Sequence, residues 1–170
     1  NIAKVAREAG VETRCEFFGD AAARSLKADC GGADLVLGNN VFAHAPDTND
    51  FVGGLRTLLK PDGWAVLEFP YGVDMIKKAE FDTIYHEHVF YFTLTPLVPL
   101  FARHGLEIFH VERIPIHGGS LRLFASQSGA RTIRGSVAAL LGQERSLGVD
   151  TPQFYARFSA RAAKVKASLV

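Results

Sequence analysis

The chain has 170 residues, of which 48% are hydrophobic and 22% charged, a balance typical of a globular domain rather than a disordered or membrane-spanning chain. Nineteen basic and 18 acidic residues leave a formal charge of +1, so no broad positive field favours nucleic acid or anionic lipid as a partner. No apolar run approaches the roughly 18 residues of a membrane span, and a signal-peptide layout is missing, so we expect a cytoplasmic protein. Cys15 and Cys30 lack the spacing of a disulfide framework or a structural zinc site.

The first half of the chain predicts alternating helices and strands. Residues 1–10 follow a helical pattern with no initiator Met before it, so we expect the chain to be a fragment of a longer protein. Predicted strands cover residues 11–18, 33–42 and 64–69, and the last two contain the continuous apolar runs of strands buried on both faces. Further helices are predicted over 21–28 and 50–59, with a turn at Pro61-Asp62-Gly63.

The second half predicts a different rhythm. Short and longer helices are predicted over 74–79 and 96–104, followed by an antiparallel pair of strands, 106–113 and 120–127, at the sheet edge, and by helices over 136–145 and 152–170. We therefore predict an α/β fold with an open, mostly parallel sheet, an antiparallel edge pair and C-terminal helices. Residues 1–128 would form a Rossmann-like domain, and 129–170 a helical segment leading to further chain.

The last predicted helix is basic on one side. It carries Arg157, Arg161, Lys164 and Lys166 and no acidic residue. Such a face is either a solvated surface or a contact with the remainder of a longer chain.

Ligands of open α/β sheets bind beyond the carboxyl ends of the strands. The residues at these ends are therefore the first candidates for a site: Gly19-Asp20, Asn39-Asn40 through His44, Pro70-Tyr71, and the connection His117-Gly118-Gly119. The connection supplies two glycines where the chain turns or lets a ligand approach its backbone, although a plain hairpin connection would also explain them.

The string FDTIYHEHVFYFT, residues 81–93, places a phenol, a carboxylate and an imidazole close together as Tyr85, Glu87 and His88. A histidine that titrates near neutrality takes a proton, a carboxylate fixes its tautomer, and a phenol hydrogen-bonds developing negative charge. The string predicts general acid/base chemistry, and the alternative is an aromatic core segment with hydrogen-bonded histidines.

A metal site is a further alternative for this string. On an extended chain His86 and His88 would point the same way and could bind zinc or iron together with His44 or a carboxylate. No H-E-x-x-H or cysteine pair supports that interpretation, and we predict no metal. The chain also lacks the motifs G-x-S-x-G, G-x-x-x-x-G-K and G-x-G-x-x-G, which argues against hydrolase, P-loop and complete dinucleotide-binding sites.

Two pairs of motifs resemble a known family. LVLGNNVFAHAPD and LKPDGWAVLEFPY resemble the fourth and fifth strands of class I S-adenosylmethionine-dependent methyltransferases. FDTIYHEHVFYFT followed by RIPIHGGSLRLFAS is similar to the sugar C-methyltransferases that act on nucleotide-linked keto-deoxysugars. The resemblance covers residues 1–127, and the terminal helices match only in general pattern.

The resemblance implies a role for each matching residue. His88 would be the base that removes a proton beside the keto group, Glu87 and Tyr85 would orient it and stabilise the enolate, and His44 would be a further active-site histidine. Other positions are implied as binding residues: Phe18, Asp20, Asn39 and Asn40 for the cofactor, and Tyr71, His117, Gly118 and Gly119 for the sugar nucleotide.

The implied function is methyl transfer from S-adenosylmethionine to a carbon next to the keto group of a nucleotide-linked sugar, as in deoxysugar biosynthesis. The family's N-terminal zinc module and its glycine-rich cofactor loop would precede Asn1. Two alternatives stay open: a catalytically silent methyltransferase-like domain that binds a sugar nucleotide or a protein partner, and metal-dependent hydrolysis through His86 and His88.

Overall fold

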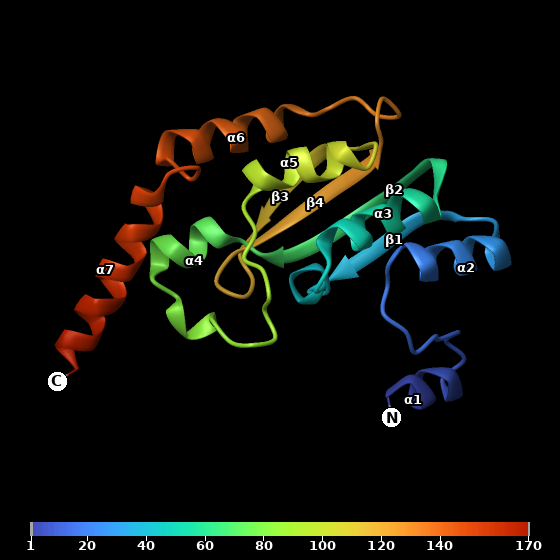
Figure 1. Cartoon of the computed structure of the whole chain (residues 1–170), viewed down its shortest axis with the longest axis horizontal. Helices are drawn as coiled ribbons and strands as arrows, with labels where there is room; N and C mark the ends of the chain where they lie inside the picture. Colours follow the sequence, from blue (N-terminus) through green and yellow to red (C-terminus); the bar gives the residue numbers. More distant parts are fainter. Residues whose placement is uncertain (1, 170) are drawn as a thin grey trace.

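A computed structural model describes residues 2–169 of the chain, which form helices and a sheet in a mixed α/β arrangement (Figure 1). The helices are α1 (Ile2–Glu8), α2 (Asp20–Cys30), α3 (Thr48–Leu58), α4 (Gly72–Lys78), α5 (Leu94–Arg103), α6 (Gly135–Leu147) and α7 (Pro152–Ser168), with short 3-10 turns η1 (Phe42–His44) and η2 (Phe81–Thr83). The strands are β1 (Ala33–Asn39), β2 (Leu59–Pro70), β3 (Leu106–Ile114) and β4 (Ser120–Gln127). The α/β class is therefore confirmed.

The four strands form one mixed sheet in the order β1-β2-β4-β3. The β1 strand runs parallel to β2, whereas β4 is antiparallel to both β2 and β3. The predicted antiparallel pair is confirmed, and β3 lies at the sheet edge as expected. Because β1 and β2 are parallel, their carboxyl ends meet at the same edge of the sheet, where Asn40 and Tyr71 follow them.

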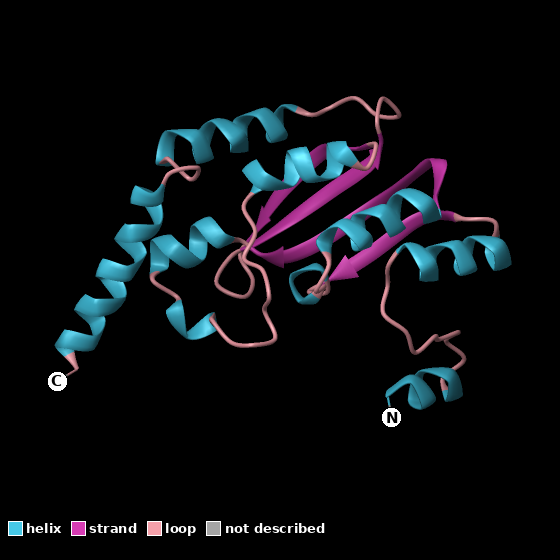
Figure 2. Ribbon diagram, viewed as in Figure 1, coloured by secondary structure: helices cyan, strands magenta, loops and turns pink. Residues whose placement is uncertain are grey.

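The core lies between one face of the sheet and the helices α3 and α5. Alternate residues of β2 point into it, and Ala65, Leu67 and Phe69 are each fully buried. Figure 2 shows these helices lying over the strands. The apolar run 64–69 thus forms the doubly buried strand that its sequence predicts, since Val66 on the opposite face is also buried.

The expectation that the strand over 33–42 is buried on both faces is wrong. The strand ends at Asn39, and Leu35 and Leu37 are 46% and 65% exposed. Within residues 2–169, β1 has a partner strand on its β2 side alone, and it is therefore an edge strand of the sheet. Apolar character alone therefore did not determine burial.

Two other local predictions are wrong. Residues 11–18 form an irregular segment rather than a strand, because no described strand lies beside them to complete a hydrogen-bond ladder. The turn expected at Pro61-Asp62-Gly63 lies inside β2, as an irregularity where the register with β1 shifts between Ala33 and Leu35. The helix predicted before residue 11 is present as α1, and its apolar Ile2 and Val5 are exposed.

The predicted C-terminal helices are confirmed as α6 and α7. The α6 helix packs on β3 and α5, and α7 packs on α4 and extends away from the sheet (Figure 1). None of the described helices is long and apolar enough to cross a membrane.

Candidate active site

A cavity of about 420 Å³ opens where β1 and β2 end. Its wall is made by the segment after β1, the start of α4, the segment around η2 and the connection between β3 and β4. The lining residues are Asn40, His44, Pro70, Tyr71, Met75, Glu80, Thr83, Tyr85, Glu87, His88, His117 and Gly119.

The cavity contains most of the site residues that the sequence predicts, from four separate stretches of the chain. They are Asn40, His44, Tyr71, Tyr85, Glu87, His88, His117 and Gly119. The fold leaves Phe18, Asp20, Asn39 and Gly118 outside this lining. We refer below to the cavity where β1 and β2 end as the histidine cavity.

His88 and Tyr85 form a hydrogen-bonded pair in the histidine cavity. The Tyr85 hydroxyl lies 3.1 Å from His88 Nε2, and the two rings are 4.4 Å apart between centroids. The other ring nitrogen, Nδ1, is buried without a hydrogen-bond partner among the described residues. The phenol can donate to the imidazole or turn its proton toward a ligand oxygen.

His44 lies against His88, with 4.8 Å between the ring centroids. Its Nδ1 is 2.6 Å from the main-chain carbonyl oxygen of Glu87, so Nδ1 carries the proton and donates it there. This bond fixes the tautomer and leaves Nε2 of a neutral His44 as an acceptor. Glu87 therefore orients His44 through its main-chain carbonyl, and the residue also lines the cavity.

The environment of His88 lowers the pKa of its imidazole below the ordinary value of 6.5. Burial is the main cause, followed by the neighbouring His44, while the Thr83 carbonyl and the Glu87 carboxylate act in the opposite direction. A lowered pKa keeps the imidazole neutral at pH 7, and a neutral imidazole is the form that accepts a proton.

Opposite changes in this pKa are expected from two substitutions. His44→Gln removes a lowering influence, so the pKa of His88 should rise toward 6.5. Glu87→Gln removes a raising negative charge, so the pKa should fall further. An NMR pH titration of the His88 ring protons measures both shifts, and shifts of the same sign would contradict the arrangement.

Tyr71 contributes its ring to the histidine cavity but directs its hydroxyl elsewhere. The hydroxyl donates to Glu144 Oε1 over 2.7 Å, and burial, helped by this carboxylate, raises the pKa of the phenol. The main-chain N–H of Tyr71 donates to the Gly119 carbonyl over 2.9 Å, and the N–H of Gly72 to the Phe92 carbonyl over 2.8 Å. Tyr71 thus joins several walls of the cavity.

The connection His117-Gly118-Gly119 is shaped by two carboxylates. All three residues have positive φ, at 50°, 78° and 132°, a conformation that favours glycine. A side chain at Gly118 would overlap the Glu80 carboxylate, and one at Gly119 would overlap the Asp74 carboxylate. The two glycines therefore permit a close approach, and only His117 projects a side chain toward the histidine cavity.

Asn40 is the most unusual residue at the end of β1. It has a positive φ of 52°, and its side-chain Oδ1 is buried with no partner among the described residues. Unpaired buried acceptors are rare, and this oxygen is available to accept a hydrogen bond from a group that enters the cavity.

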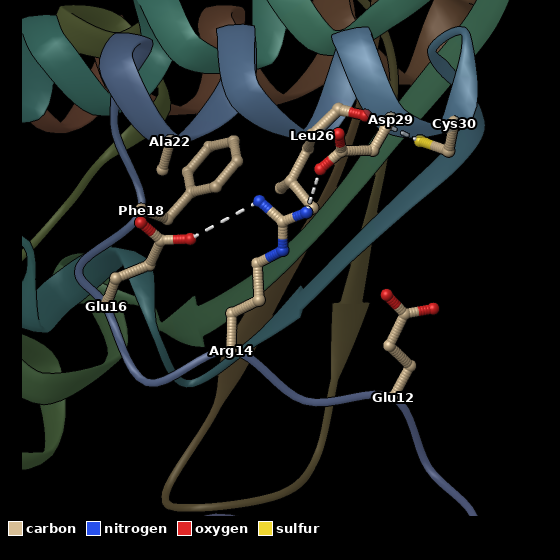
Figure 3. Close-up of a pocket in the computed structure, with 8 residues that line it drawn as sticks. All are labelled: Glu12, Arg14, Glu16, Phe18, Ala22, Leu26, Asp29 and Cys30. Atoms are coloured by element: carbon tan, nitrogen blue, oxygen red, sulfur yellow. Dashed lines mark hydrogen bonds and ion pairs between the residues drawn. The ribbon is translucent and has the colours of Figure 1, made fainter.

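Phe18 and Asp20, both predicted to contact a cofactor, have other neighbours. Phe18 packs edge-on against Phe51 and lines a second pocket of about 400 Å³ between α2 and the segment before it, where Arg14 reaches toward α2 (Figure 3). The Asp20 carboxylate accepts hydrogen bonds from Thr57 Oγ1 at 2.5 Å and from Arg24. Its pKa is lowered, mainly by the Thr57 bond.

The sequence does not predict Met75, Glu80 and Thr83 as cavity residues. Pro70 is predicted as a strand-end position, but without a role in binding. Glu80 gave no signal, because its position depends on how α4 leads into η2. That Glu80 faces Gly118 could be found only from the fold.

The geometry behind a metal site is not present. His86 and Glu87 lie in a turn, so His86 and His88 are not alternate residues of an extended chain, and His86 is exposed. Across residues 2–169 no group of three or more His, Cys, Asp or Glu side chains is arranged to hold a metal ion.

Comparison with known proteins identifies a related C-methyltransferase. The chain is 39% identical to the C-methyltransferase NovU of Streptomyces niveus over 99% of its own length. The match covers 40% of that relative, so the chain spans less than half of the curated protein it resembles.

Solved structures show the same fold at low identity. A SAM-dependent methyltransferase from Anabaena variabilis matches 72% of this chain and 62% of its own, with 16% identity and a TM-score of 0.53. A chain in the complex of the Haloferax volcanii Trm112 methyltransferase activator with a putative methyltransferase matches 74% and 67%, with 15% identity and a TM-score of 0.51.

Two family profiles divide the sequence between them. The C-methyltransferase C-terminal domain matches residues 115–170, and the methyltransferase domain matches residues 3–111, which is more than half of the chain. The chain therefore belongs to the methyltransferase domain family, whose members take the methyl group from S-adenosylmethionine.

Proposed function

We propose that the protein transfers a methyl group from S-adenosylmethionine to a carbon next to the keto group of a nucleotide-linked sugar. The observation that carries the proposal is the cluster of His44, His88 and Tyr85 in a cavity at the carboxyl ends of β1 and β2. Support also comes from the 39% identity to a C-methyltransferase and from the match to the C-methyltransferase C-terminal domain.

The residues at the end of β1 fit the cofactor. The buried, unpaired Oδ1 of Asn40 is an acceptor suited to an amino group of S-adenosylmethionine. When bound, the cofactor supplies an electrophilic methyl group. We assign cofactor binding to Asn40 and Asn39, and keep Phe18 and Asp20 as predicted neighbours of the adenine, although the carboxylate of Asp20 is already hydrogen-bonded to Thr57 and Arg24.

The histidine pair then acts on the substrate. A keto group acidifies the adjacent carbon, and neutral His88 accepts its proton at Nε2 when Tyr85 turns its hydroxyl from that nitrogen to the keto oxygen. The phenol donates to the oxygen as negative charge develops there. His44 donates from Nδ1 to the Glu87 carbonyl, so its Nε2 accepts a hydrogen bond from a sugar hydroxyl.

The remaining cavity residues position the sugar. Tyr71 presents its ring, His117 its imidazole and Gly119 its backbone, and Gly118 is needed to form the turn rather than to touch substrate. The cavity volume of about 420 Å³ is sufficient for a hexose ring with the transferred methyl group. Residues 1–128 would carry these groups, and the helices of 129–170 would support them from outside.

Isothermal titration of S-adenosylhomocysteine into the protein tests the cofactor part of this proposal. We expect binding that Asn40→Ala weakens by roughly tenfold to 150-fold, since a hydrogen bond to a charged group is worth about 1.5–3 kcal/mol. Asn49→Ala, an exposed amide on α3, serves as the matched control and should bind as wild type. Failure of the wild-type protein to bind would favour a catalytically silent binding domain instead.

A further inference from the structure

A shallow hollow of about 390 Å³, distinct from the histidine cavity and from the pocket beside α2, lies between the end of α4 and the outer part of α7. It is strongly basic, although the chain as a whole has a formal charge of only +1. Its lining residues are Lys77, Lys78, Ala79, Arg161, Lys164, Val165 and Ser168. Four of the side chains are cationic and none is acidic, so the hollow favours an anion.

The hollow has a fixed framework and unpaired charges. Arg161 Nη1 donates to the main-chain carbonyls of Lys77, at 2.6 Å, and Ile76, at 3.3 Å, which holds α7 against the end of α4. Within the described chain no hydrogen bond or ion pair occupies the ammonium group of Lys77 or Lys164. Two cations are thus free to bind a ligand from opposite walls.

Lys78 connects this basic hollow to the histidine cavity. Its ammonium group donates to the Gly118 carbonyl and lies 3.9 Å from Glu80 Oε1. Glu80 lines the histidine cavity, and so do His117 and Gly119 on either side of Gly118. Lys78 lines the basic hollow and contacts two residues, Gly118 and Glu80, at the wall of the histidine cavity.

The two spaces differ in charge. The lining of the histidine cavity includes the acidic residues Glu80 and Glu87 and no lysine or arginine, so this cavity suits a neutral polar ring better than a phosphate. The basic hollow has the opposite preference. A molecule that joins a neutral sugar ring to a diphosphate would satisfy both.

We propose that the basic hollow binds the diphosphate of the substrate while the sugar ring occupies the histidine cavity. This inference rests on the proposed function, since it assumes a nucleotide-linked sugar. It gives the basic face of α7 a binding role, with Lys77, Lys78 and Lys164 contacting the diphosphate oxygens and Arg161 holding the two helices together.

Isothermal titration of inorganic pyrophosphate and of thymidine diphosphate into the protein, at low ionic strength, tests the site. Lys77→Gln and Lys164→Gln should each weaken binding of both ligands by about tenfold, equivalent to roughly 1.4 kcal/mol. Lys166→Gln is the matched control, because Lys166 lies on the same helix and carries the same charge but lines a different hollow with Phe81. Its affinity should stay within about twofold of wild type.

Three results would overturn the proposal. The first is an equal loss of affinity in Lys166→Gln, which would indicate diffuse electrostatic attraction. The second is unchanged affinity in Lys77→Gln and Lys164→Gln. The third is binding of pyrophosphate without binding of the nucleoside diphosphate. Titration of S-adenosylhomocysteine into the same variants separates the two hypotheses. If S-adenosylhomocysteine binds normally and the lysine substitutions leave the affinity for the diphosphate ligands unchanged, the proposed subsite is wrong and the proposed methyltransferase function is unaffected.

Discussion

Replacing His88 with alanine is expected to slow methyl transfer by about a hundredfold to ten-thousandfold, the contribution typical of a positioned general base. Two features of the site motivate this expectation. The imidazole is held neutral by burial and by His44, and Nε2 is already hydrogen-bonded to the phenol of Tyr85 at 3.1 Å. The rate is measured by following transfer of a labelled methyl group from S-adenosylmethionine to the substrate.

A neighbouring histidine gives the control for this variant. His86 is exposed, lies in a turn and does not line the histidine cavity, so His86→Ala should retain the rate within about twofold. Affinity for S-adenosylhomocysteine should change little in either variant, because neither residue is assigned to the cofactor. Equal losses of rate in His86→Ala and His88→Ala, or a His88→Ala rate above a tenth of wild type, would contradict the role of His88.

Replacing Glu144 with alanine is expected to lower the free energy of unfolding by about 3–5 kcal/mol, since each buried polar group left unpaired costs roughly 1–3 kcal/mol. Glu144 of α6 is fully buried and accepts four hydrogen bonds. The donors are the Tyr71 hydroxyl and the Leu94 N–H to Oε1, each at 2.7 Å, and the N–H and hydroxyl of Thr95 to Oε2, at 2.7 and 2.5 Å.

This carboxylate ties three parts of the fold together. Two of its bonds satisfy N–H groups at the start of α5, where a negative charge is favoured by the helix dipole, and a third anchors Tyr71 of the histidine cavity. Urea unfolding measures the loss. Tyr71→Phe removes a single donor and should cost about 1–2 kcal/mol, while Gln143→Ala, an exposed neighbour on α6, should change stability by less than about 0.5 kcal/mol.

A loss below about 1 kcal/mol in Glu144→Ala would contradict this assignment, because it would mean that water or a rearranged neighbour satisfies the four donors. A comparable loss in Gln143→Ala would show that the effect is not specific to the buried carboxylate, since alanine favours the helix at an exposed position. The two variants differ in burial but lie side by side in the same helix, so the comparison isolates the buried carboxylate.

Local residue patterns correctly predicted several strands. The run 64–69 became the buried strand β2, and the alternating strands around residues 114–119 became the antiparallel pair β3 and β4. Burial of β1 could not be predicted in the same way. Leu35 and Leu37 are as apolar as the leucines of β2, but their exposure depends on which other segments cover that face.

The histidine cavity was predictable because a simple rule joins distant residues. Parallel strands bring their carboxyl ends to one sheet edge, and this rule alone predicts that Asn40, His44 and Tyr71 lie together. Charged residues were harder. Glu144 lies in the string LGQERSL, which gives no sign of burial. Asp20 follows Gly19 at the end of a predicted strand that does not form, and its carboxylate is hydrogen-bonded to Thr57.

The most direct measurement is transfer of a ¹³C-labelled methyl group from S-adenosylmethionine to a nucleotide-linked keto sugar, with the product identified by NMR. The site predicts a new carbon–carbon bond at the position next to the keto group, formed by the wild-type protein and lost in His88→Ala. A label attached to an oxygen of the sugar, or no transfer by a protein that binds S-adenosylhomocysteine, would contradict the proposal that the histidine cavity catalyses C-methylation.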